Sequence, residues 1–321
     1  MKREKALMTI FLIKPVMVIV ALIILGGHFS NAYAQTIEKA VFPTELMIQK
    51  ITEAMPNQPQ FTPKVKRKIL VFSLSHQFYH QCIPVGKKAF EIMGKKTNAF
   101  DVVICDDIAM FERENLSQFD AILLNNAYFE KFISIKDITR GYFNSFKDGE
   151  RDKIDAYDKK LKHNFVEFIR SGKGLIVLHA AVASLSTWPD YGTMVGARFD
   201  GHPWKGQDVY FKIDRKNHPL TAAFNSIPFV LNDEIYQVKA PYSRKHLTVL
   251  VSIDSNKTTM NRKGINRKDK DFGISWIKTY GKGRVFYCAL GHDPALFWNP
   301  MILQHYLDGI QYAIGDCRVS Q

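Results

Sequence analysis

Cysteine is scarce in this sequence, and none of it stands in a pattern that binds metal or exchanges electrons. Four cysteines occur among 321 residues, and no two of them have C-x-x-C spacing. Zinc-ribbon and thioredoxin-like sites depend on that spacing, so neither is expected. Cys105 and Cys288 lie inside strand-like runs, which predicts buried free thiols at both positions.

Helical zinc-binding patterns, internal repeats and low-complexity segments are also missing. No predicted helix carries H-E-x-x-H or H-x-x-x-H spacing, so the sequence contains no metalloprotease signature. Acidic residues are outnumbered, which leaves a net charge of +13. Much of the excess lies in residues 256–271, here called the basic segment, whose polar, aperiodic pattern predicts a solvated loop. Because no aromatic residues alternate with its charges, nucleic acid is not an expected partner.

The N-terminus has the layout of a secretory signal peptide. Basic residues come first, an apolar stretch follows from Val16 to Leu25, and Ala32-Tyr33-Ala34 forms an A-x-A cleavage pattern before Gln35. We expect residues 1–34 to be removed and the mature protein to be periplasmic or secreted. Lys14-Pro15 interrupts the apolar run, so no stable membrane span is expected after cleavage, although an uncleaved anchor is the alternative.

After an N-terminal extension at residues 35–66, the chain alternates between strand-like and helical patterns. Short apolar runs that suit buried strands occur at 68–73 and 174–178, and further strand-like runs occur at 101–105 and 119–124. Helical patterns between them predict an α/β fold with a doubly wound, mostly parallel sheet. In the C-terminal half, 208–213 alternates like a half-exposed strand, and Gly281-Lys-Gly283 between two strand patterns predicts a β-hairpin.

Polar side chains follow the ends of several predicted strands. His76 and His80 follow the first, Asn125 ends the third, His179 ends the fourth, and His292-Asp293 follow the last. Ligands in open α/β sheets bind outside the carboxyl ends of the strands. These residues therefore predict a polar pocket at one edge of the sheet.

His179 and His292 are the candidate catalytic residues, because imidazole exchanges protons near neutral pH. Asp233 or Glu234 would orient one of them or act as the partner base. Trp204, Tyr236 and Trp298 are candidates to contact a substrate ring, together with the polar candidates His80, Asn125, His202 and Asp293. For each residue alone, ordinary structural packing or hydrogen bonding is the alternative.

A metal site is a second use of the same histidines. His80, His179, His202 and His292, with Glu234, could supply nitrogen and oxygen ligands for a divalent metal such as zinc. Alternatively, His202-Pro203 and His218-Pro219 are turn residues, since X-Pro favours extended or turn geometry.

Several motifs resemble one family. They are Gly172-Lys-Gly-Leu-Ile-Val-Leu-His-Ala-Ala, Gly196-x-x-Phe-x-Gly-His-Pro, Asn217-His-Pro, Asp233-Glu-x-Tyr and Gly281-Lys-Gly-Arg-Val-Phe-Tyr-x-x-Leu-Gly-His-Asp. In this order they resemble the trehalose-utilisation, or ThuA-like, family over about residues 67–315, as does Phe78-Tyr-His-Gln-Cys-Ile-Pro84. The resemblance implies one class I glutamine amidotransferase-like domain with a flavodoxin-like sheet. It also implies a role in sugar metabolism, with oxidised (keto) glycosides as the substrate class.

The sequence departs from true amidotransferases at the nucleophile. Where these have a G-x-C-x-G elbow, this chain has Val177-Leu-His179-Ala-Ala181, so thiol chemistry is not expected. It departs from the ThuA-like pattern by an insertion at 128–153 and by the basic segment. Two functional hypotheses result. The first is an exported carbohydrate-active hydrolase, lyase or isomerase, and the second is a non-catalytic sugar-binding or accessory module.

Overall fold

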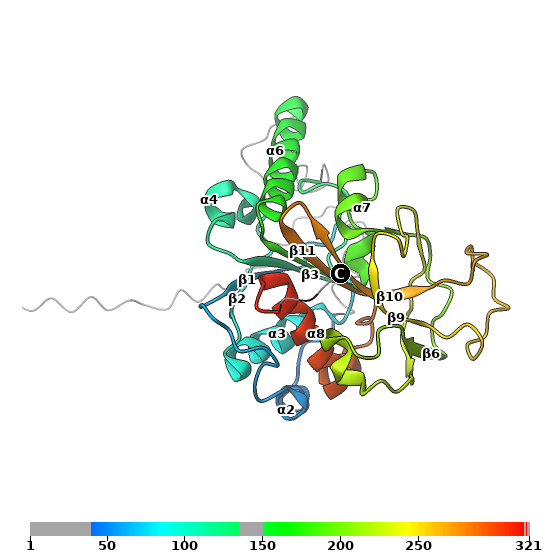
Figure 1. Cartoon of the computed structure of the whole chain (residues 1–321). Helices are drawn as coiled ribbons and strands as arrows, with labels where there is room; N and C mark the ends of the chain where they lie inside the picture. Colours follow the sequence, from blue (N-terminus) through cyan, green and yellow to red (C-terminus); the bar gives the residue numbers. More distant parts are fainter. Residues whose placement is uncertain (1–39, 77, 135–149, 318, 320–321) are drawn as a thin grey trace, which may run out of the picture.

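In the computed structural model, the described part of the chain comprises residues 40–76, 78–134, 150–317 and 319 (Figure 1). Its centre is a nine-stranded sheet with the order β2-β1-β3-β4-β11-β10-β9-β6-β7. The expected signal peptide and most of the expected insertion, residues 135–149, lie outside the described residues. No helix of the described part is long and apolar enough to cross a membrane.

Five neighbouring strands of this sheet are parallel and form its core. In spatial order they are β2 (Asp101–Ile104), β1 (Lys68–Phe72), β3 (Ala121–Asn125), β4 (Gly174–Leu178) and β11 (Gly283–Cys288). Numbered along the chain, this is the 2-1-3-4-5 order of flavodoxin-like folds. Every residue of β3 and β4 is buried, as their apolar runs predicted. The predicted fold class is thereby confirmed.

Helices cover both faces of the parallel core (Figure 1). On one face lie α2 (Glu45–Ala54), α3 (Ile83–Thr97) and α8 (Pro300–Ile314). On the other lie α4 (Arg113–Leu116), α6 (Arg151–Arg170) and α7 (Pro189–Val195). Short 3-10 turns connect these layers: η1 (Ile108–Phe111), η2 (His179–Ala183), η3 (Pro219–Phe224) and η4 (Pro294–Trp298).

Four antiparallel strands extend the sheet beyond β11. They are β10 (Gly273–Tyr280), β9 (Thr248–Ile253), β6 (Asp208–Ile213) and β7 (Phe229–Asn232). The hairpin predicted around Gly281 is confirmed, because Tyr280 pairs with Gly283. A separate two-stranded sheet joins β5 (Arg198–Phe199) to β8 (Val238–Lys239).

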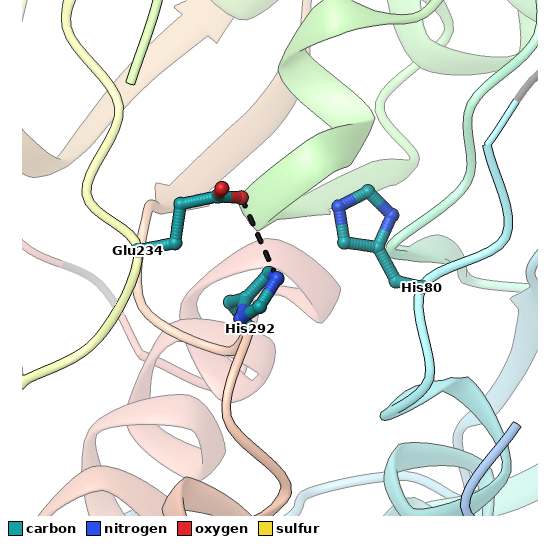
Figure 2. Close-up of side chains that lie close together, drawn as sticks. All are labelled: His80, Glu234 and His292. Atoms are coloured by element: carbon teal, nitrogen blue, oxygen red, sulfur yellow. Dashed lines mark ion pairs between the residues drawn. The ribbon is translucent and has the colours of Figure 1, made fainter. Parts of the chain in front are cut away.

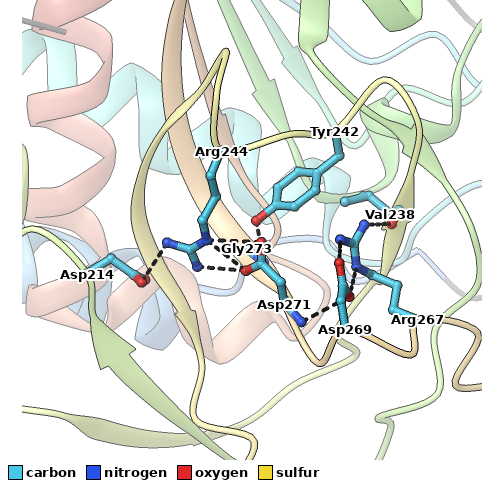
Figure 3. Close-up of polar contacts among 8 residues, drawn as sticks. All are labelled: Asp214, Val238, Tyr242, Arg244, Arg267, Asp269, Asp271 and Gly273. Carbon is cyan, nitrogen blue, oxygen red and sulfur yellow. Dashed lines mark hydrogen bonds and ion pairs between the residues drawn. The ribbon is translucent and has the colours of Figure 1, made fainter.

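The end of the basic segment is held to the domain by ion pairs (Figure 3). Arg244 binds Asp271 through two nitrogens, at 2.7 to 3.0 Å, and Asp214 at 2.8 Å. Arg267 pairs with Asp269 and is itself mostly buried. The segment is therefore only partly the solvated loop that the sequence predicted, since its last residues are fixed by charge-assisted hydrogen bonds.

The N-terminal extension packs on the domain rather than leading away from it. Helix α2 begins at the cap residue Thr44, whose Oγ1 accepts a hydrogen bond from Met47 N. It buries Ile51 completely against the core. Lys96 of α3 donates to two carbonyls at the C-terminal end of α2, where a cation is favoured by the helix dipole.

Asp308 makes the stability of α8 depend on pH. It is fully buried, accepts a hydrogen bond from Gln304 at 2.7 Å, and burial raises the pKa of its carboxyl to about 7. The unfolded chain releases this proton near pH 4, so the free energy of unfolding falls as the pH rises from about 4 to 7. We expect Asp308→Asn to gain about 2 to 4 kcal/mol over the wild type across this window.

The measurement is the melting temperature of both proteins from pH 5 to 8. The two curves should diverge as the pH rises, with the variant more stable at pH 8. Asp208→Asn, at an exposed position in β6, is the matched control and should follow the wild type. If the melting temperatures of Asp308→Asn and the wild type changed with pH in parallel, ionisation of the buried carboxyl would not lower the stability of the protein.

Candidate catalytic centre

Three histidines from three different strand ends meet at the carboxyl edge of the parallel core. His80 follows β1, His179 follows β4 and His292 follows β11. The ring centroids of His80 and His179 are 5.2 Å apart, those of His80 and His292 are 5.6 Å apart, and those of His179 and His292 are 5.4 Å apart. The parallel topology therefore brings together the residues that the strand-end pattern singled out.

His179 stands at the position of the missing nucleophile and keeps an unusual backbone. Its φ is 45°, a left-handed value that is uncommon for a residue with a side chain and that concentrates at functional sites. Its Nδ1 lies 2.7 Å from the carbonyl oxygen of Ala289. A carbonyl only accepts, so Nδ1 carries a proton, and in the neutral ring this leaves a lone pair on Nε2. The side chain is 0% exposed, so His179 is the most deeply buried of the three histidines.

Glu234 joins the three rings, and its two oxygens have different neighbours. Oε2 lies 3.5 Å from Nε2 of His179. It also lies 3.6 Å from Nε2 of His292, the contact drawn in Figure 2. Oε1 lies 2.9 Å from Nζ of Lys205 and 3.3 Å from Nδ1 of His202. One oxygen thus faces the buried histidines, and the other faces two side chains that are about half exposed.

Asp233, the adjacent acid, is engaged by backbone. Its Oδ1 accepts a hydrogen bond from Asp293 N at 2.8 Å, and its Oδ2 accepts from Gly291 N at 3.0 Å and from His292 N at 3.4 Å. Gly291 has a φ of 129°, which only glycine adopts readily. Asp233 therefore fixes the turn that carries His292.

The charges of the cluster follow from burial and from mutual contact. Burial, followed by the neighbouring His179 and His292, lowers the pKa of His80 to about 2. Burial, followed by His179, lowers the pKa of His292 to about 4. Burial raises the pKa of Glu234, but contacts with His179, Lys205 and His292 outweigh it and leave that pKa well below its usual range. At neutral pH an ionised carboxylate thus faces two neutral imidazoles, His80 and His292.

A structural histidine in the same protein shows what the cluster lacks. His305 is fully buried, and both ring nitrogens have partners, Ser275 Oγ at 2.8 Å and Leu220 O at 2.8 Å. In the cluster, Nδ1 of His80 and Nε2 of His179 are buried without a hydrogen-bond partner. Buried polar atoms are normally paired, so unpaired ones call for an explanation beyond packing.

Of the aromatic candidates, only Tyr236 joins the cluster. Its ring packs on His179 at 4.2 Å between centroids, and its hydroxyl lies 3.4 Å from Nε2 of His80. Trp204 is fully buried against Phe272, so it offers no face to a substrate in this structure. Trp298 lies in η4, with Lys50 of α2 over its ring.

Two polar candidates serve the fold at the same rim. Asn125 is fully buried and donates to Ser73 Oγ and to Ile83 O, both at 3.2 Å. Asp293 caps η4 by accepting a hydrogen bond from Ala295 N at 2.8 Å. Both side chains hold the loops that carry the histidines.

The sequence analysis missed two residues of the site. Lys205 contacts Glu234, and Phe199 packs on Tyr236 at 4.6 Å between centroids. Lys205 directly follows the candidate Trp204 in the sequence. No motif or spacing in the sequence marks it as a residue of the site. Phe199 also lines a cleft of about 280 Å³ beside the cluster. Other residues lining this cleft are Tyr128, Glu130, Arg198 and Lys239.

Comparison with known proteins agrees with the motifs. The ThuA family, described as trehalose utilisation, matches residues 68–313. A ThuA-like protein of Bacteroides uniformis is 20% identical, with a TM-score of 0.56 over 78% of this chain and 92% of its own. A ThuA-like protein of Parabacteroides merdae is 17% identical, with a TM-score of 0.55 over 81% of this chain and 93% of its own. No curated protein sequence matches. The chain belongs to the ThuA family, a family of carbohydrate metabolism.

Proposed function

We propose that this protein is an exported enzyme that acts on a keto-glycoside or a related sugar by proton transfer at the histidine–Glu234 cluster. One observation carries the proposal: Nε2 of the buried His179 has no hydrogen-bond partner and faces the ionised carboxylate of Glu234. An electron-rich, preorganised centre of this kind is what proton abstraction requires. The sugar substrate is supported by the family alone.

The chemistry would be an elimination next to a ketone. One acceptor among Glu234, His179 and His292 takes a single proton from the carbon beside the carbonyl group. The electron pair that remains expels the glycosidic oxygen from the next carbon, and that oxygen regains the proton. Of these three, His292 is the most exposed, with 18% of its side chain accessible, so it is the natural proton carrier to the leaving oxygen.

Sugar recognition would fall to the outer residues. The imidazole of His202 is about half exposed and stacks on Phe199 at 6.0 Å between centroids. Phe199 also lines the neighbouring cleft of about 280 Å³, which has room for a single sugar ring. Aromatic faces beside charged side chains suit the alternating apolar and hydroxyl surfaces of a sugar.

The test is to incubate the purified protein with a keto-disaccharide and with the unoxidised disaccharide, and to follow the products. Turnover of the keto form alone supports the proposal. Saturable binding of either sugar without products would favour a sugar-binding module. Turnover of the unoxidised sugar would retain the enzyme but reject elimination, because that reaction needs the carbonyl group.

No thiol is expected to take part. The buried Cys82 donates its Sγ proton to Gly291 O at 3.1 Å, and burial raises the pKa of its thiol well above the usual value. A thiol held protonated is a poor nucleophile. We expect Cys82→Ser to keep kcat/KM within about threefold, because a hydroxyl can make the same hydrogen bond. Loss of turnover with an unchanged melting temperature would bring the thiol back into the mechanism.

Export is proposed from the N-terminal pattern, which lies outside the described residues. The mature chain should begin near Gln35, after Ala32-Tyr33-Ala34. N-terminal sequencing of the protein from the native cell envelope tests this. An intact Met1 terminus in the membrane fraction would replace export with anchoring.

A further inference from the structure

On the inner side of the cluster, ring nitrogens of His179 and His292 face the same carboxylate oxygen of Glu234. Nδ1 of His179 donates to Ala289 O, so its Nε2 faces the carboxylate of Glu234 as an acceptor. Nε2 of His292 approaches the same oxygen, Oε2. A ring-nitrogen lone pair and a carboxylate oxygen that face each other repel, unless a proton on the ring or a metal ion lies between them.

The distances distinguish these two cations. A proton shared by an imidazolium and a carboxylate gives an N···O distance of about 2.7 to 2.9 Å. Two ligands of one ion, with bonds of about 2.0 to 2.1 Å in tetrahedral geometry, lie about 3.3 Å apart. Oε2 of Glu234 lies 3.6 Å from Nε2 of His292. This distance is too long for a shared proton and close to the spacing of two ligands of one metal ion.

His80 completes the ligand set. One of its ring nitrogens is turned toward the carboxylate of Glu234 (Figure 2). One donor atom from each of His80, Glu234 and His292 lies within 4.8 Å of the other two. Lys205 and His202 occupy Oε1 of Glu234, which leaves Oε2 free to bind an ion through a single oxygen.

The chemistry of the available donor atoms supports this assignment. The sulfur of Cys82 is directed to Gly291 O, so it is not among the donors that face the cluster. The available donors are therefore nitrogen and carboxylate oxygen, which favour zinc and similar transition metals over Mg²⁺ or Ca²⁺.

We propose that His80, Glu234 and His292 bind one divalent transition-metal ion, with zinc as the best match, and that His179 lies beside the ion rather than in its ligand set. Three protein ligands leave a coordination position for substrate, as in catalytic zinc sites. As a catalytic ion it rests on the elimination proposed above and reassigns its roles. Glu234 and His292 would hold the ion, the ion would polarise the substrate carbonyl, and His179 would accept the proton and return it to the leaving oxygen. The binding itself does not depend on that function.

The test measures zinc binding without any sugar. The chain is stripped with a chelator and dialysed, then titrated with Zn²⁺ by calorimetry, with Mg²⁺ as the hard-ion comparison. We expect one Zn²⁺ per chain, a higher melting temperature with Zn²⁺, and no response to Mg²⁺. His80→Ala, Glu234→Gln and His292→Ala should each weaken binding by at least about a hundredfold, since even outer-shell changes cost about 10- to 100-fold.

His246→Ala is the matched control, because His246 is exposed and outside the cluster. It should bind Zn²⁺ like the wild type. The proposal fails if the stripped wild type does not bind Zn²⁺, or if the Glu234→Gln variant binds it unchanged. Melting temperatures of the metal-free variants show whether each is folded. Turnover by the stripped protein would reject a catalytic ion but keep the proposed reaction. Zinc binding without turnover would keep the metal site but reject the proposed reaction.

Discussion

Glu234→Gln is expected to lower kcat/KM for a keto-disaccharide by about a thousandfold while the chain stays folded. Glu234 is the shared neighbour of His179, His292, His202 and Lys205, and its carboxylate is ionised. Glutamine keeps the size of the side chain but removes its negative charge. Both a proton acceptor and an ion ligand need that charge, so the loss is expected with or without a bound metal.

The same variant should melt close to the wild-type temperature. Its inner oxygen has no hydrogen bond to lose, because the contacts with His179 and His292 are 3.5 and 3.6 Å long. Its outer contact with Lys205 is half exposed, and such pairs contribute little. Glu91→Gln, which loses only an exposed pair with Lys88, is the control for both measurements. A Glu234→Gln variant with more than a tenth of wild-type activity would remove Glu234 from the chemistry.

Much of the fold was predictable because the parallel core has a strong local signal. A run such as 174–178, apolar at every position, suits a strand with helices on both faces, and the structure buries all of it. The strand ends then predict which polar residues meet, because parallel strands bring their carboxyl ends to one edge. This is how His80, His179 and His292 could be grouped from residues more than 200 positions apart.

The parts that could not be predicted depend on contacts that sequence patterns do not encode. Asp233 and Glu234 are adjacent, and no local rule says which one the 291–293 turn binds. A tryptophan reads the same in the sequence whether its ring is buried or exposed to a sugar. In the structure, the backbone β-bridge between Trp204 and Ile235 accompanies a Trp204 ring packed against Phe272. The order of the antiparallel strands is likewise set by long-range pairing, which their individual patterns leave open.

Asp233→Asn is expected to destabilise the protein by about 3 to 5 kcal/mol, far more than the change at Glu234. Asp233 is only 3% exposed, and both of its oxygens accept backbone hydrogen bonds from the turn at residues 291–293. An asparagine can accept at one atom only. Its amide nitrogen would face a backbone N–H, leaving a buried donor unpaired in addition to the lost charge-assisted bonds.

Chemical denaturation and kcat/KM, measured together, separate a positioning residue from a catalytic one. If Asp233 holds the turn that carries His292, both stability and turnover should fall in Asp233→Asn. Asp293→Asn is the control, because its exposed side chain only caps η4 through Ala295 N, and it should cost about 1 kcal/mol or less. Full stability with turnover abolished in Asp233→Asn would instead make Asp233 a catalytic group, and the proton transfer assigned to Glu234 would then have to be shared between the two acids.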